Sequence, residues 1–339
     1  MKHRSASRSA VLLVATGLQL AGCAGTGSGG GSPSPAVTPS LEPMRTVDPT
    51  SPAPVDATQA TVEVGGELIG IAWADGAAWV ADYPDGELIR IDPATNAVVK
   101  RIKVGAGALV VAAGEGAVWV TNHEDGTVSR VDPATNAVTD TFSPGEQVEG
   151  IAVGFGSVWV TLEPAGQVLR LDPQTGEVLA TLDTGGTPRH VEVGPDAVWV
   201  TGTYSADLRR IDPATNEVSD RVRVGAGSEG IAPSASTLWT AALVDARVVQ
   251  VDPRSLRAIQ AVRVGPGVEG LLLHDGSLWA VCQADGTLWR LDAETGEIQG
   301  VATVGPGARR VVFGDGTLWV PAKDGTLARV DPSRVTSGS

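Results

Sequence analysis

Six letters recur almost unchanged in this chain: IDPATN at residues 91–96, VDPATN at 131–136 and IDPATN at 211–216. The first two copies start forty residues apart, and the third starts eighty residues later. Proline presets φ at the second position of a turn, and the preceding aspartate side chain accepts hydrogen bonds from backbone amides two residues on. The hexapeptide therefore predicts a tight turn, which is repeated because the unit that carries it is repeated.

Tryptophan and glycine show the same period along most of the chain. Seven tryptophans stand forty residues apart: Trp79, Trp119, Trp159, Trp199, Trp239, Trp279 and Trp319. Seven glycines keep the same interval: Gly65, Gly105, Gly145, Gly185, Gly225, Gly265 and Gly305. We therefore predict seven units between residues 60 and 332.

One unit, residues 108–142, alternates short runs rich in Val, Thr and Trp with Gly, Asp and Pro, and shows no helical spacing. It predicts four strands, at about 109–113, 117–122, 127–131 and 137–142. Four-stranded units of about forty residues, repeated four to eight times, are typical of a β-propeller. A parallel β-helix is the alternative, but its coils are much shorter. We predict an all-β, seven-bladed β-propeller in which each tryptophan fills the gap between neighbouring blades.

The two ends of the repeat region predict how the ring closes. Only seven residues follow Pro332, too few for the outer strand that the seventh unit lacks. The run ATVEVGG at 60–66 aligns with RIKVGAG at 101–107, so an N-terminal strand is predicted to pair onto the last blade. Such pairing removes an open sheet edge. Residues 333–339 are predicted to be a disordered tail.

An export signal precedes the repeats. Lys2, Arg4 and Arg8 are followed by an apolar run at 10–20 that is too short to span a bilayer. The run LAGC at 20–23 resembles the lipobox of bacterial lipoproteins, which implies cleavage of a signal peptide at 1–22 and attachment of lipid to Cys23. The alternative is an ordinary secretory signal with an incidental cysteine.

The segment at 23–59 is rich in Gly, Ser and Pro and predicts a disordered tether. We therefore expect an extracytoplasmic protein, held at the outer face of the cell membrane only through its lipid. The formal net charge of −14 would repel phosphate backbones and anionic lipid surfaces, so no nucleic-acid partner is expected. We expect a monomer.

Two short motifs carry a family resemblance over residues 60–332. Trp119-Val120-Thr121-Asn122 is similar to the signature of YVTN-repeat propellers, with Trp in place of Tyr. The run Gly-Ile-Ala at 70–72 and 150–152, followed by a turn and Trp-Val, resembles the repeats of virginiamycin B lyase. Both groups have seven blades, so the resemblance implies the same fold.

The second resemblance also implies an activity. It points to a metal-assisted eliminase that opens a cyclic depsipeptide, with a divalent cation such as Mg²⁺ and a His beside carboxylates. His190 with Glu149 and Glu229, or His123 with Glu124, have the residue types that this chemistry needs. No motif position transfers residue by residue, so neither a catalytic set nor metal ligands are assigned.

The loops that enter each inner strand and those that join the second and third strands open on one face, the default binding surface. The position four residues after each repeated glycine predicts a ring at the channel mouth: Ile69, Leu109, Glu149, Arg189, Glu229, Glu269 and Arg309. His190 and Arg310 follow directly, where four other blades have glycine. The loops between second and third strands add Tyr83, His123 and Tyr204 to the predicted ligand-binding set.

An apolar side of this ring faces a charged side, which suits an amphiphilic ligand. We therefore predict a binding module for a small molecule, a cell-wall or peptide fragment, or an envelope protein. The alternatives are a metal-dependent lyase or hydrolase, and a structural interaction platform. As an alternative, the charged residues of the ring simply form ion pairs with one another around a water-filled hole. Each such pair contributes about 0–1 kcal/mol to stability. Glu192 stands where other blades have Ala, Leu or Val, which predicts a partner such as Arg or a backbone amide.

Overall fold

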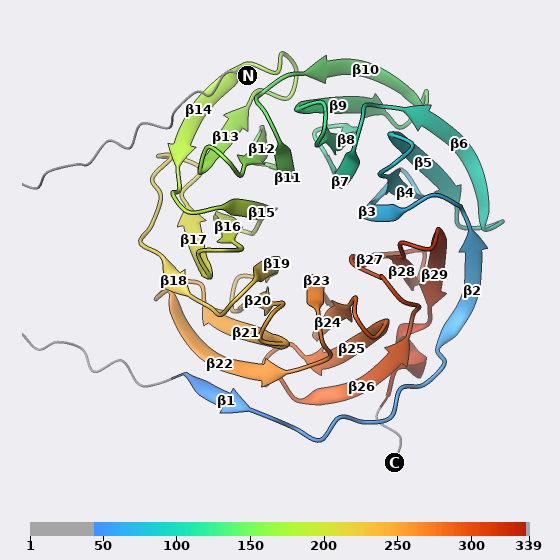
Figure 1. Cartoon of the computed structure of the whole chain (residues 1–339), viewed down its shortest axis with the longest axis vertical. Coiled ribbons are helices and arrows are strands. Elements are labelled where there is room, and N and C mark those ends of the chain that lie inside the picture. The colour runs from blue at the N-terminus through green and yellow to red at the C-terminus, as the bar shows by residue number, and fades with distance from the viewer. Residues whose placement is uncertain (1–43, 337–339) are drawn as a thin grey trace, which may run out of the picture. The chain divides into compact units, whose positions relative to one another are not determined.

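Seven antiparallel sheets surround a central channel in the computed structural model, which describes residues 44–336 (Figure 1). The predicted signal peptide, Cys23 and the first part of the predicted tether lie outside the described residues. The strands of blades 1 and 2 are β3 (Leu68–Ala74), β4 (Ala77–Asp82), β5 (Glu87–Asp92), β6 (Ala97–Lys103), β7 (Ala108–Gly114), β8 (Ala117–Asn122), β9 (Thr127–Asp132) and β10 (Ala137–Phe142). Those of blades 3 and 4 are β11 (Val148–Gly154), β12 (Ser157–Leu162), β13 (Gln167–Leu171), β14 (Val178–Asp183), β15 (Pro188–Val193), β16 (Val198–Gly202), β17 (Asp207–Ile211) and β18 (Val222–Arg223).

Blades 5 and 6 comprise β19 (Ser228–Pro233), β20 (Leu238–Ala242), β21 (Arg247–Asp252), β22 (Arg257–Arg263), β23 (Val268–His274), β24 (Ser277–Cys282), β25 (Thr287–Asp292) and β26 (Ile298–Thr303). Blade 7 contains β27 (Val312–Gly314), β28 (Thr317–Pro321), β29 (Thr326–Val330) and, as its outer strand, β2 (Thr58–Glu63). β2 pairs antiparallel with β29, for example Thr61 opposite Ala328. The seven-bladed propeller and its closure by an N-terminal strand are therefore confirmed.

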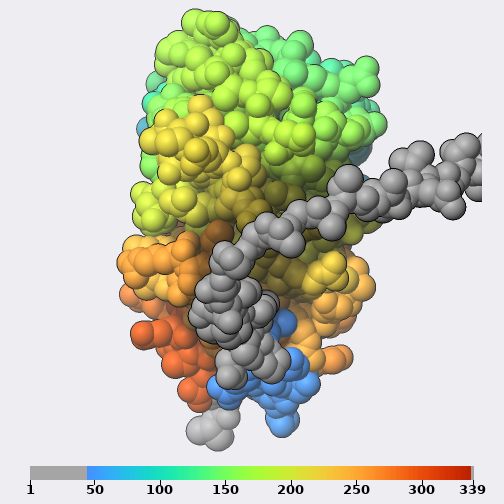
Figure 2. Space-filling model, turned by 90° about the vertical axis from the view of Figure 1, so that its left-hand side faces the viewer, coloured from blue at the N-terminus to red at the C-terminus, as the bar shows by residue number. Residues whose placement is uncertain are grey.

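The predicted tether is shorter than expected, because residues 45–59 pack on the propeller. β1 (Arg45–Val47) pairs parallel with the outer strand β22 of blade 5. Val55 bridges to Ala302 of blade 6, and Ala57 is fully buried. Figure 2 shows this segment, in blue, against the orange and red blades. Outer strands carry unpaired backbone groups, which an extended chain can satisfy, so the tether prediction is wrong for these residues.

The predicted disordered tail is also wrong for its first residues. Pro332–Arg334 form a 3-10 helix (η1), and the Asp331 side chain accepts a hydrogen bond from the Ser333 amide. Val335 is fully buried in a core cluster of blades 6 and 7. Burial of an apolar side chain holds this stretch in place; residues 337–339 lie outside the described part.

The repeated tryptophans lie between blades, as predicted. All seven are at most 1% exposed. Trp79, for example, packs with Val118 and Val120 of the next blade. Each such indole buries about 150–250 Å², so the inter-blade gaps hold the largest part of the core.

Arginines on the third strands give the DPATN turn a second role. Arg90 donates to Pro133 O at 3.0 Å and Asn136 Oδ1 at 2.9 Å, both in the turn of the next blade. Arg170 and Arg329 make the same pair of bonds to the turns that end in Asn216 and Asn96. Each guanidinium also lies over the tryptophan of its own blade, 4.4–5.3 Å from the ring centroid. The hexapeptide thus receives a clamp from the preceding blade.

Candidate functional site at the channel mouth

The mouth residues start the inner strands, and the threonine of the Trp-Val-Thr motif holds them there. Thr121, Thr161 and Thr201 each donate their hydroxyl to a mouth carbonyl of the next blade, at 2.8–2.9 Å. The acceptors are the carbonyl oxygens of Glu149, Arg189 and Glu229. The repeated motif therefore sets the height of the charged side chains above the channel.

In four blades the residue that follows the mouth position is glycine, and the reason is steric. A Cβ on Gly70, Gly150, Gly230 or Gly270 would lie only 2.1–2.4 Å from a backbone oxygen of the next blade. Blades 4 and 7 carry His190 and Arg310 at this position instead. These two side chains therefore project over the channel at the places where the scaffold leaves room for them.

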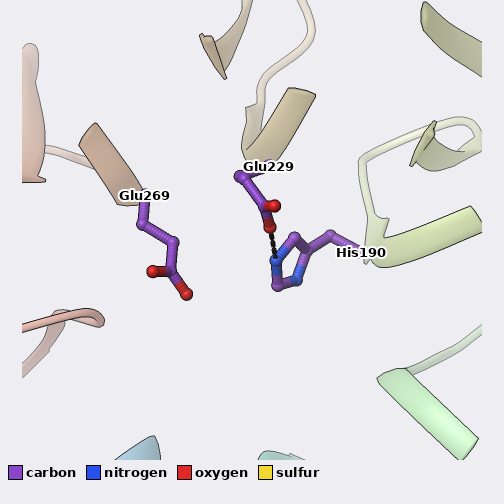
Figure 3. Close-up of side chains that lie close together, drawn as sticks. All are labelled: His190, Glu229 and Glu269. Atoms are coloured by element: carbon purple, nitrogen blue, oxygen red, sulfur yellow. Dashed lines mark hydrogen bonds and ion pairs between the residues drawn. The ribbon is translucent and has the colours of Figure 1, made fainter. Parts of the chain in front are cut away.

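A buried chain of side chains links blades 4, 5 and 7. The Nε2 of His190 lies 2.5 Å from Glu229 Oε2 (Figure 3). On the other side of the ring, Arg310 Nη2 lies 2.9 Å from His190 Nδ1. Because Nε2 faces a carboxylate and Nδ1 faces a cationic donor, we assign a neutral imidazole protonated on Nε2. Glu229 also lies 3.1 Å from the Thr203 hydroxyl and 3.6 Å from Arg189 Nε. His190 therefore bridges an anion and a cation.

The surroundings favour this neutral form. Burial, followed by the Arg310 charge, lowers the pKa of His190 to about 4. Burial alone would raise the pKa of Glu229, but the His190 imidazole and the Arg189 and Arg310 guanidiniums outweigh it and lower the pKa. At neutral pH the pair is thus a neutral imidazole and a carboxylate.

Two further carboxylates have weaker partners. Glu269 lies 3.7 Å from Arg309 Nε, and Glu149 lies 3.4 Å from His123 Nδ1. Both distances exceed those of good charge-assisted hydrogen bonds. Burial raises the pKa of both glutamates in spite of the neighbouring arginines. These carboxylates are therefore only partly compensated by the protein.

Two arginines of the mouth have hydrogen-bond donors without acceptors. The Nε atoms of Arg309 and Arg310 are buried and make no hydrogen bond within the described residues. A buried donor without an acceptor costs about 1–3 kcal/mol. Glu269 thus lies beside two arginines whose Nε atoms make no hydrogen bond in the described residues, whereas Glu149 has Arg189 and His123 as its cationic neighbours.

The channel below this ring has a volume of about 420 Å³ and is lined mainly by residues with apolar side chains, although polar atoms contribute more than half of its exposed surface. His190, Glu192 and Arg310 are the ionisable groups that line it within the described chain. Glu192 makes no ion pair in the described part, although enclosure by protein raises its pKa to about 7 and the Arg310 charge partly opposes this. Its side chain is exposed to the channel, so water there solvates it and offsets part of the effect of enclosure.

The predicted loop residues divide into two groups. His123 joins the ring through Glu149, and Tyr83 donates to Glu124 Oε1 at 3.2 Å, which ties the loops of blades 1 and 2 together. Tyr204 is 77% exposed, and its hydroxyl makes no hydrogen bond within residues 44–336. Of these three loop residues, His123 therefore contacts the ring, Tyr83 contacts the neighbouring loop, and Tyr204 is exposed.

Three side chains of the mouth that could ligate a metal ion lie close together. Atoms of His190, Glu229 and Glu269 all lie within 4.8 Å of one another, and Figure 3 shows Glu269 directed toward the other two. Both imidazole nitrogens are engaged, however, and Arg310 Nη2 lies within 3.2 Å of each. A guanidinium at this position repels a divalent cation, and Mg²⁺ prefers oxygen ligands in octahedral geometry. As arranged, these residues do not fit Mg²⁺.

Thr203 and the motif threonines were not among the residues predicted from sequence. Thr203 contacts Glu229 from the loop between β16 and β17. The motif threonines carried a signal, since Thr recurs after Trp-Val at 121, 161 and 201. Their recurrence indicates a role in the scaffold. The contact of Thr203 with Glu229, by contrast, has no repeat signal and is visible only in three dimensions.

Comparison with known proteins supports the fold alone. No family model matches the chain, and no curated protein matches its sequence. Virginiamycin B lyase from Staphylococcus aureus is similar in structure, with a TM-score of 0.70, 14% identity, and coverage of 80% of this chain and 98% of that one. A catalytically inactive form of that lyase with quinupristin has a TM-score of 0.69, 15% identity, and coverage of 78% and 94%.

The hydrazine synthase of Kuenenia stuttgartiensis is equally similar, with a TM-score of 0.70, 12% identity, and coverage of 83% and 99%. The same fold thus occurs in proteins whose names indicate different functions. In the described residues no helix has the length and apolar character needed to cross a membrane.

Proposed function

We propose that this protein is an extracytoplasmic, lipid-anchored binding module that holds a ligand with both a cationic and an anionic group at the channel mouth. A short peptide with free ends, such as a peptide fragment of the cell wall, has this chemistry. The observation that carries the proposal is that two partly exposed arginines, Arg309 and Arg310, share the mouth with two carboxylates whose ion-pair partners lie at 3.4 and 3.7 Å.

A peptide carboxylate would pair with the accessible part of the Arg309 and Arg310 side chains. Charge-assisted bonds between arginine and a carboxylate are short and roughly twice as strong as neutral ones. A peptide ammonium would pair with Glu149 or Glu269, whose pKa values are raised by burial in spite of the neighbouring arginines. The channel below, which is lined mainly by residues with apolar side chains, would accommodate a side chain of the ligand.

Calorimetric titration of the full-length protein with a dipeptide tests the proposal. A dipeptide with free ends should bind, and the same dipeptide with acetylated and amidated ends should not. Arg309→Gln should weaken binding roughly tenfold or more, because one charge-assisted bond is lost. Arg254→Gln, an exposed arginine in a turn of the opposite face, serves as the matched control. Equal affinity for the free and the blocked dipeptide would contradict the proposal.

The alternative of a metal-dependent lyase has one observation in its favour, the proximity of His190, Glu229 and Glu269. Because Arg310 lies against the imidazole, we expect the melting midpoint to be unchanged by chelator and by Mg²⁺, Mn²⁺, Ca²⁺ or Zn²⁺. A metal at a hundred times its dissociation constant would add about 2.7 kcal/mol of stability, which is easily detected. A midpoint raised by one metal would favour the lyase over the binding module.

A further inference from the structure

A second pocket lies between blades 5 and 6, on the face opposite the channel mouth, and encloses about 520 Å³. Its walls are the loop between β19 and β20, the hairpin between β23 and β24, and the turn that follows β25. This volume is typical of pockets that hold small molecules or single side chains with their neighbours. We call it the blade 5/6 pocket.

The arginine clamp is missing at this junction. In blades 1, 3 and 7 an arginine crosses from the third strand to the next turn. Gln250 stands at that position in blade 5, and its shorter amide reaches Thr237 Oγ1 and Glu294 O, each at 3.0 Å. The receiving turn has Gly296 where the clamped turns end in asparagine. The guanidinium and its side-chain acceptor are therefore both absent.

The walls of the pocket are acidic. Asp275, Asp292 and Glu294 line it, and within the described chain neither arginine nor lysine does. Asp75 and Asp315, which occupy the hairpin position of Asp275 in blades 1 and 7, pair with their clamp arginines at 3.4 and 3.1 Å. Asp275 is exposed and has no ion-pair partner in the described residues. At this junction the carboxylate therefore lacks the guanidinium that pairs with its counterparts in blades 1 and 7.

We propose that the blade 5/6 pocket binds an arginine side chain of a partner peptide, whose guanidinium pairs with Asp275 as the clamp arginines pair with Asp75 and Asp315. The planar guanidinium suits carboxylate acceptors, with which it can form two parallel hydrogen bonds. Asp275 supplies the charge, while the serines at 234 and 236 supply hydroxyl groups beside it. The volume left over accommodates the residues that flank the arginine. This site is separate from the mouth, which lies at the other end of the inner strands.

Fluorescence polarisation with the full-length protein tests the proposal, using a labelled peptide, acetyl-Gly-Arg-Gly-amide, and its citrulline counterpart. The arginine peptide should bind roughly tenfold or more tightly than the citrulline peptide, because only the former is charged. Gln250→Arg should abolish binding, since it restores the guanidinium of the repeat inside the pocket. Asp275→Asn should weaken binding roughly tenfold.

Glu115→Gln is the matched control, because Glu115 is an exposed carboxylate at the same hairpin position of blade 2. It should leave the affinity unchanged. Equal binding of the two peptides, no binding of either, or binding unaffected by Asp275→Asn would each overturn the proposal. Because Asp275 is exposed, Asp275→Asn should fold normally. It therefore tests the proposal even if Gln250→Arg fails to fold. The peptide has blocked ends, so loss of its binding says nothing against the channel mouth.

Discussion

Acidification should destabilise this protein through His190 in particular, and the variant His190→Gln isolates the effect. The native imidazole has a pKa of about 4 because it is buried beside Arg310, whereas in the unfolded chain its pKa is about 6.5. Between these values the unfolded state binds a proton that the native state does not. Stability from this group is therefore complete above pH 6.5 and is lost as the pH falls toward 4.

The two pKa values set the magnitude. Linkage between pH 7 and pH 5 removes about 2 kcal/mol from the free energy of unfolding. Glu149 and Glu269 have raised pKa values and change stability in the opposite direction over part of this range, so the total pH dependence mixes both signs. Glutamine can still donate to Glu229 but does not titrate. The stability difference between wild type and His190→Gln therefore reports His190.

Urea unfolding of both proteins at pH 7 and pH 5 measures this difference. We expect the wild type to lose about 2 kcal/mol relative to His190→Gln on acidification. An NMR titration of the imidazole should place its midpoint near pH 4. A stability difference that does not change with pH, or that shifts in favour of the wild type, would refute the assigned neutral bridge.

Three further predictions concern the scaffold. Deleting Thr58–Glu63 should lower the free energy of unfolding by about 3–6 kcal/mol, because the last blade loses its outer strand and buried apolar surface; deleting residues 24–43 of the predicted tether should leave urea unfolding unchanged. Trp159→Ala should cost about 3–5 kcal/mol in the same assay, and a loss below 1 kcal/mol would contradict the role of the indole between blades. Arg90→Gln should cost about 1.5–3 kcal/mol, more than Arg210→Gln, whose guanidinium bonds within its own blade; equal losses would argue against the clamp.

Periodicity made the scaffold predictable from sequence. The interval of the tryptophans gave the number of blades, and alternating apolar runs placed the strands of blade 2 within one residue. The alignment of residues 60–66 with a later repeat predicted closure. Residues 45–59 and 333–336 were misjudged because they pack through a few contacts, such as Val55 with Ala302 and the burial of Val335, and short non-repetitive stretches carry no period.

The site was predictable as a set of residues but not as a network. Positions that depart from the repeat, such as His190 and Arg310, marked the mouth correctly as the place where charge gathers. Which nitrogen faces which partner depends on distances of a few tenths of an ångström between blades, which sequence does not specify. The blade 5/6 pocket was equally hard to predict. Gln250 stands out when the repeats are aligned, because the other repeats have arginine there, but the acidic walls around it appear only in three dimensions.

The imidazole NMR spectrum during titration with a dipeptide tests the binding site most directly. The chain has four histidines, of which His123 and His190 lie at the mouth and His274 lies on the opposite face. We predict that a dipeptide with free ends shifts the His190 and His123 resonances to saturation and leaves that of His274 in place. Shifts confined to His274, or no shifts at any peptide concentration, would contradict a binding site at the channel mouth.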